Sequence, residues 1–264
     1  MGDSLAVEIA QQAHSNVLRQ LCGALLPHET LRYRCPVPRS DFIELLAIDD
    51  PVGIQKLPKA VFEDKPAMRD TNVFAAAGRA YQQVNLIQQD SQQKRDQTSG
   101  VILGADFDGL AGKVMAPRNR VAVLILLTIE VASRGTCTPR LLATLLGCWI
   151  HVLLFRRVLF AIMHDIFKQG RGLPQDQVFT LTQQSRNELL MLAAVGPVAQ
   201  SDLRVGYSKH LYCTDASPTG GAVIRAVVGS KVTQEMWRHS EQRVFFYQIA
   251  KPSICDADRT GIAI

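Results

Sequence analysis

Two adjacent carboxylates, Asp49 and Asp50, are the residues of this sequence with the clearest chemical potential. They stand between two short apolar segments, 42–48 and 52–57, in a pattern typical of two strands joined by a tight acidic turn. Neighbouring carboxylates repel each other unless a cation or a basic group lies between them. Hard oxygen ligands favour Mg²⁺, and a surface turn without any ligand stays the alternative on spacing alone.

A second acidic position lies near the end of the sequence. Residues 211–214 predict a strand that ends at Asp215, and a glycine-containing turn follows at 217–221. Residues 222–228 predict the next strand. A second hairpin is therefore expected, with Asp215 at the end of its first strand.

Helices are predicted on both sides of the acidic pair. In residues 5–26 an apolar residue recurs at every fourth position, which predicts an amphipathic helix whose stripe faces the core. Residues 72–88 predict another helix with Tyr81 on its apolar face. The stripe of the first helix consists of Leu5, Ile9, Ala13, Val17, Leu21 and Leu25.

The middle of the chain is predicted to be mostly helical. Residues 104–109 form an expected turn rather than a calcium-binding loop. Thr138, a capping hydroxyl before a proline, is expected to start a helix over 138–167 with a break near Gly147. A further helix is predicted at 185–195.

Basic residues concentrate in the same middle part. The net charge is +5, yet residues 113–175 alone hold nine basic and two acidic side chains, a local excess of seven. Arginine outnumbers lysine 20 to 9, and guanidinium groups bind phosphate in a bidentate manner. Such a field attracts polyanions, and a solvated helix face is the alternative. Farther along, Trp237 and His239 could stack on a base, although a structural pair is favoured.

The composition is that of a soluble globular protein, because 47% hydrophobic residues allow a sizeable core. The six cysteines include no C-x₂-C pair, so reduced and mostly buried thiols are expected rather than a zinc site. The apolar runs 121–129 and 141–155 are shorter than the roughly 20 residues of a membrane span. The N-terminus lacks the basic segment of a secretory signal, so an intracellular location, cytoplasmic or nuclear, is expected.

Residues 42–50, Phe-Ile-Glu-Leu-Leu-Ala-Ile-Asp-Asp, resemble the strand–Asp-Asp–strand motif of the reverse transcriptase palm. Later segments follow in the order of that family. Residues 75–86 with Tyr81 resemble the palm helix, and Lys94 stands where such enzymes place a lysine beside the incoming nucleotide. Residues 103–104 resemble the start of the primer-gripping region. Residues 121–169 resemble the thumb and connection.

The hairpin around Asp215 is similar to the opening hairpin of ribonuclease H domains, in which the aspartate is a metal ligand. Retroelement polyproteins often place that domain after the polymerase connection, so the order of the motifs agrees. The likeness is closest to retrotransposon polymerases, among which the DIRS-like branch is one candidate. It covers residues 3–243, and the order of the motifs is more specific than any one of them.

The resemblance implies an α+β fold with three parts: a partial palm at 1–112, a basic helical thumb and connection at 113–206, and a truncated ribonuclease H-like segment at 207–264. It implies a fragment of an RNA-directed DNA polymerase that uses Mg²⁺, an RNA template or RNA–DNA hybrid, and deoxynucleotides. The metal ligands would be Asp49, Asp50 and Asp215. Lys94 would steady the nucleotide phosphates. The residues that follow the template–primer backbone would be Arg118, Arg120, Arg156 and Arg157.

The chain departs from the family in its carboxylates. A two-metal polymerase needs a further acidic residue from an earlier palm strand, and the acids before Asp49 stand in unsuitable contexts. The ribonuclease H part needs a Glu, for which Glu235 and Glu241 are candidates, and an Asp, for which Asp256 and Asp258 are candidates. The chain is therefore expected to be incomplete at both ends and inactive alone. The alternatives are a catalytically dead nucleic-acid-binding remnant and a helical membrane-associated or interaction protein.

Overall fold

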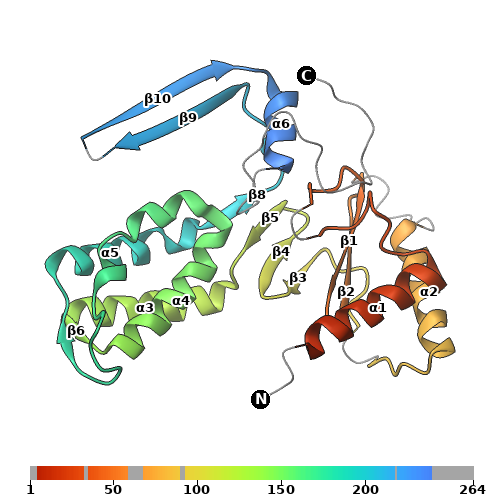
Figure 1. Cartoon of the computed structure of the whole chain (residues 1–264), viewed down its shortest axis with the longest axis horizontal. Coiled ribbons are helices and arrows are strands. Elements are labelled where there is room, and N and C mark those ends of the chain that lie inside the picture. Colours follow the sequence, from red (N-terminus) through yellow and green to blue (C-terminus); the bar gives the residue numbers. More distant parts are fainter. Residues whose placement is uncertain (1–4, 33–34, 59–67, 90–92, 218, 240–264) are drawn as a thin grey trace. The chain divides into compact units, whose positions relative to one another are not determined.

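The protein divides into two compact units, each described here by itself (Figure 1). The computed structural model describes residues 5–32, 35–58, 68–89, 93–217 and 219–239. Unit 1 consists of Met1–Gln93 with Gly206–Ile264, and unit 2 consists of Lys94–Val205. Position 112 lies inside unit 2, between two strands that pair with each other.

Unit 1 is a mixed α+β unit with two separate antiparallel hairpins. The β1–β2 hairpin packs with helices α1 and α2, and the β9–β10 hairpin is followed by a short helix. The elements are α1 (Ala6–Cys22), β1 (Phe42–Ala47), β2 (Asp50–Gln55), α2 (Arg69–Gln83), β9 (His210–Ser217), β10 (Gly220–Val227) and α6 (Ser230–Arg238).

The core of unit 1 is small and lies between α1, α2 and β1. The apolar stripe predicted on α1 is partly wrong, because Leu5 and Ile9 are 54% and 63% exposed while Leu18 is buried. An every-fourth pattern drifts about 40° around a helix at each step, so six such residues cannot share one face. The buried cluster consists of Leu18, Ala24, Leu25, Phe42, Val73, Ala77 and Tyr81.

Unit 2 begins with a four-stranded antiparallel sheet in the order β3-β4-β5-β8. The predicted turn at 104–109 is wrong for residues 105–108, which form a strand. Turns lie on both sides of this strand, at Leu103 and Gly104, both at positive φ, and at 109–112. The strands are β3 (Ser99–Ile102), β4 (Ala105–Asp108), β5 (Lys113–Met115) and β8 (Gln200–Asp202).

The rest of unit 2 is helical, and α3, α4 and α5 lie together around one core (Figure 1). Fully buried side chains at its centre include Trp149, Leu153 and Ile166. The predicted cap is confirmed, since the Thr138 hydroxyl accepts from Leu141 N–H at 3.2 Å. The elements are α3 (Arg118–Arg134), β6 (Thr136–Cys137), α4 (Pro139–Leu153), η3 (Leu154–Ile162), η4 (Ile166–Lys168), β7 (Phe179–Thr180), α5 (Gln183–Val195) and η5 (Gly196–Val198).

The long helix predicted over 138–167 is shorter than expected and does not break at Gly147. Helix α4 ends at Leu153, and η3 is kinked at Arg156, whose φ of −148° and ψ of 68° are not helical. The Phe155 carbonyl beside this kink accepts from the Ser201 hydroxyl at 2.6 Å, so a bond to β8 replaces a helical one. By length and composition alone, Pro139–Ile162 could cross a membrane, and its buried residues belong to the core of unit 2.

Candidate metal centre

The acidic pair lies at the tip of the β1–β2 hairpin, as predicted. Ala47 pairs with Asp50, so Ile48 and Asp49 alone make a two-residue turn. Both aspartates are exposed. The hairpin therefore presents two consecutive carboxylates to solvent at one end.

Ile48 is the strained residue of this tip. Its φ is 60°, in the left-handed region that β-branched residues rarely adopt. Such conformations persist where surrounding contacts fix them, and they gather at functional sites. The turn therefore adopts a conformation that a β-branched residue does not favour by itself.

Helix α1 supplies the contacts that fix the turn. The Gln11 side chain uses both ends of its amide, donating to Leu46 O at 3.0 Å and accepting from Ile48 N–H. Nδ1 of His14 lies 2.9 Å from Ile48 O. Gln11 and His14 are one helical turn apart, so a single face of α1 clamps the backbone beside Asp49.

His14 also joins the hairpin to α2. Its Nε2 lies 2.7 Å from the hydroxyl of Tyr81. Because Ile48 O can only accept, Nδ1 must carry a proton, and in the neutral ring Nε2 then accepts from the Tyr81 hydroxyl. Burial raises the pKa of Tyr81 to about 12, so the hydroxyl keeps its proton at neutral pH. Sequence analysis noted Tyr81 but missed Gln11 and His14, which carry no motif of their own.

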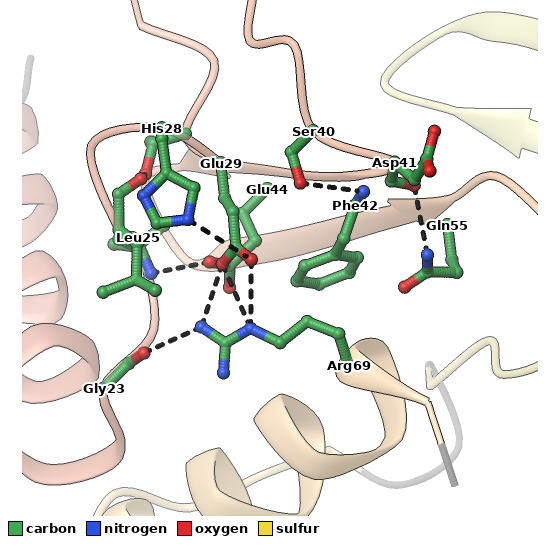
Figure 2. A network of polar contacts seen from close by, with 12 residues as sticks. Gly23, Leu25, His28, Glu29, Ser40, Asp41, Phe42, Glu44, Gln55 and Arg69 are labelled. Carbon is green, nitrogen blue, oxygen red and sulfur yellow. Dashed lines mark hydrogen bonds and ion pairs between the residues drawn. The ribbon is translucent and has the colours of Figure 1, made fainter. Parts of the chain in front are cut away.

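A buried ionic network supports the other end of β1 (Figure 2). Glu29 and Glu44 are 7% and 4% exposed, and Arg69 at the start of α2 faces both. The guanidinium donates to both oxygens of Glu29, at 2.9–3.2 Å, and to Gly23 O at 3.0 Å. Oε2 of Glu44 accepts from Leu25 N–H at 2.7 Å. The network therefore ties α1, the following loop, β1 and α2 together.

Glu44 gives this network a pH dependence with a defined sign. Burial raises its pKa above the ordinary 4.5, and the Leu25 N–H bond and the Arg69 charge offset this only in part. The folded state therefore binds protons more tightly than the unfolded state, so stability is lost as pH rises from 4.5 through the folded pKa.

Glu44→Gln is expected to remove this loss, because glutamine does not titrate while its carbonyl can still accept from Leu25 N–H. Relative to wild type, the variant should become more stable as pH rises from 4 to 7 in urea unfolding. Asp41→Asn, at an exposed carboxylate of the same hairpin, serves as the control and should leave the pH slope unchanged. Parallel curves for wild type and Glu44→Gln would contradict the assignment.

The donor set at the tip suits one hydrated Mg²⁺. Mg²⁺ keeps several waters and is commonly held by one or two carboxylates together with substrate phosphates. Asp49 and Asp50 offer such a pair, but among the described residues there is no cluster of three or more acidic, histidine or cysteine side chains that could hold a metal. Within the described residues, Asp49 and Asp50 are thus the two carboxylates that the hairpin tip itself supplies.

The remaining predicted site residues lie elsewhere. Lys94 is exposed and is the first residue of unit 2, which also contains the four predicted arginines. Asp215 is exposed and lies within β9, paired with Ala222, so the prediction that it ends the strand is wrong. Glu235 pairs with Arg39 and Arg238, and residues 241, 256 and 258 lie outside the described residues.

The four predicted phosphate-binding arginines are all exposed, in two pairs. Arg118 and Arg120 begin α3 directly after β5, and Arg156 and Arg157 lie in η3. Both pairs border the β5–β8 ladder, since η3 packs on β8, which pairs with β5. Three other cations of the basic stretch have acidic partners: Arg134 with Glu130, Arg140 with Asp176, and Lys168 with Asp165.

A smaller expectation concerns the cysteines. The cysteines of the described residues are free thiols, but only Cys137 among them is buried and two, Cys148 and Cys213, are exposed, so the expectation of mostly buried thiols is wrong. Comparison with protein-family models, curated proteins and solved structures finds no match to this chain.

Proposed function

We propose that this chain is part of a Mg²⁺-dependent RNA-directed DNA polymerase, a reverse transcriptase of retroelement type, with Asp49 and Asp50 as the metal ligands. The hairpin tip carries the proposal. Its two-residue turn exposes both carboxylates, and α1 holds the strained Ile48 through Gln11 and His14. Two exposed arginine pairs in unit 2 support the same function, because guanidinium groups suit a phosphate backbone.

Each group of residues has its own role in the proposed nucleotidyl transfer. Asp49 and Asp50 hold the ion, and their fixed turn sets its position relative to the protein. When bound, Mg²⁺ supplies the Lewis acidity that activates a primer 3′-hydroxyl and balances charge on the leaving pyrophosphate. Within unit 2, Lys94 would contact nucleotide phosphates and the four arginines would contact the template–primer backbone. Asp215 belongs to a separate RNA-cleaving site of the ribonuclease H type.

A catalytically dead nucleic-acid-binding remnant is the second candidate. One observation favours it for the chain by itself: within the part of the chain that the structure describes, a third metal-ligating carboxylate is absent near the tip. This candidate keeps binding of RNA–DNA hybrid, weakened steeply by salt, and lacks primer extension with any metal.

Replacing Asp49 by Asn tests the metal site directly. The change keeps the size of the side chain and removes the charge that attracts the cation, so Mn²⁺ binding should weaken about tenfold or more. Free Mn²⁺ is measured by electron paramagnetic resonance, and Mg²⁺ should displace it from the wild type. Asp50→Asn should behave in the same way.

Asp41→Asn is the matched control, because Asp41 is a 73%-exposed carboxylate of the same unit, next to the opposite end of the hairpin. Primer extension and filter binding on RNA–DNA hybrid then separate the two candidates. Extension that Asp49→Asn abolishes supports the polymerase, whereas hybrid binding with neither extension nor Mn²⁺ binding at Asp49 supports the remnant. Unchanged Mn²⁺ affinity in Asp49→Asn would exclude this residue from the metal site.

A further inference from the structure

Unit 1 has a second candidate site, a hollow of about 450 Å³ beside α6. Its volume is in the range of ordinary ligand sites, roughly 300–1,000 Å³. Charged and aromatic side chains line it together. The lining residues are Val37, Pro38, Arg39, Tyr207, Lys231, Gln234, Glu235, Trp237 and Arg238.

Direct bonds hold the walls of this α6 pocket in place. Val37 N–H donates to Arg238 O at 3.1 Å, and Nε of Arg238 donates to Val37 O at 2.7 Å. The Arg238 side chain is only 8% exposed. The segment that contains Val37 is thus fastened to the C-terminal turn of α6, across 201 residues of sequence.

The pocket is positively charged. Glu235 bonds to both Arg39 and Arg238, at 2.8 and 2.7 Å. Although burial alone would raise its pKa, the bonds from these two guanidinium groups lower it overall, so Glu235 is ionised at neutral pH. Lys231 adds a third cation, for which the described residues give no ion pair. Three cations against one carboxylate leave the lining with two positive charges.

Two aromatic rings stand beside these cations. The centroids of Tyr207 and Trp237 are 5.7 Å apart with an interplanar angle of 59°, and their side chains are 38% and 50% exposed. Half-exposed rings of this kind offer flat apolar faces on which a base can stack. The ring partner of Trp237 that the structure shows is Tyr207.

We propose that the α6 pocket binds single-stranded nucleic acid. One unpaired base stacks on Trp237 and Tyr207, and the adjoining phosphates lie beside Lys231 and Arg39. A single strand fits better than a duplex because only unpaired bases expose their faces to a protein ring. The net positive lining favours a polyanion over a neutral proline-rich peptide, which aromatic grooves also bind. This site is separate from Asp49 and does not depend on metal there.

The two tryptophans of the chain make the test direct. Trp149 is fully buried in unit 2, so quenching of tryptophan emission by a short oligothymidylate should come from Trp237. Trp237→Ala should weaken binding of the labelled oligonucleotide about tenfold or more in fluorescence anisotropy, because a stacking partner is lost. Trp237→Phe keeps an aromatic face and should bind within about threefold of wild type while losing the quenching signal.

Charge variants complete the experiment. Lys231→Ala should lower the slope of log affinity against log salt by about one, the effect of one lost phosphate contact. Lys56→Ala, an exposed cation of unit 1 outside the pocket, should leave the slope unchanged. Oligonucleotide binding should be the same in the presence of Mg²⁺ and of EDTA, which separates this site from the metal site. Unchanged affinity in a folded Trp237→Ala, or capture of a proline-rich peptide in place of the oligonucleotide, would overturn the proposal.

Discussion

Replacing Arg69 by methionine is expected to lower the free energy of unfolding of unit 1 by about 3 kcal/mol, because breaking a buried ion pair strands its partner. Glu29 has its side chain only 9% exposed and takes three bonds from this guanidinium. The charge of Arg69 also acts on Glu44. Methionine fills similar space and supplies neither charge nor donors, so two buried carboxylates lose their one shared cation.

The loss should depend on pH in a predictable direction. Without Arg69, the folded state favours protonated carboxyl groups more strongly, so it binds more protons than the unfolded state. Stability of Arg69→Met should therefore fall as pH rises, and the difference from wild type should be largest near pH 7 and shrink towards pH 4. Urea unfolding followed by tryptophan emission in a Trp149→Phe background measures this in unit 1, because Trp237 is then the remaining tryptophan.

Two further variants separate charge from geometry. Arg69→Lys keeps a cation but cannot bond both oxygens of Glu29 at once, so an intermediate loss is expected. Adding Glu29→Gln to Arg69→Met removes one stranded charge and should restore part of the stability. A loss in Arg69→Met that is the same at pH 4 and pH 7 would show that packing, rather than the stranded carboxylates, sets the effect.

This network was beyond the reach of sequence analysis for a physical reason. Glu29 and Arg69 are 40 positions apart, and neither has a local pattern that requires a partner. Glu44 was noted only as an acid preceding Asp49, because strand alternation alone does not say that a carboxylate is buried. The same holds for Gln11 and His14, whose roles depend on where the hairpin meets α1.

Local signals succeeded where one short segment decides the structure. The hairpin around Asp49 was predicted because two apolar strands flank a tight polar turn, and the cap at Thr138 because its hydroxyl precedes a proline. They failed where a contact between residues far apart in the sequence decides the structure. Helix α4 ends just before Phe155, whose carbonyl accepts from the Ser201 hydroxyl. Strand β8 is three polar residues long and forms through its pairing with β5.

Replacing Trp149 by alanine is expected to be the most damaging change in unit 2, at about 3–5 kcal/mol, the range for truncating a large buried aromatic residue. The indole is fully buried, and a methyl group added at Gly196 would come within 2.8 Å of its ring, so it fills its space closely. Its Nε1–H donates to the Thr128 hydroxyl at 2.8 Å, and that hydroxyl donates to Leu124 O. Alanine leaves both a cavity and an unused acceptor.

Thr128→Val separates these two losses, because valine keeps the volume and leaves only the indole N–H without an acceptor, at a cost of about 1–3 kcal/mol. Far-UV circular dichroism follows the helices of both units during urea unfolding, while in Trp149→Ala the emission of Trp237 reports unit 1 alone. If the units unfold independently, Trp149→Ala shifts the first signal and leaves the second.

The functional consequence follows from where the residues lie. The carboxylate hairpin belongs to unit 1 and the four arginines to unit 2, so Trp149→Ala should weaken binding of RNA–DNA hybrid while Mn²⁺ binding at Asp49 persists. Equal loss of both would show that the two units depend on each other for folding.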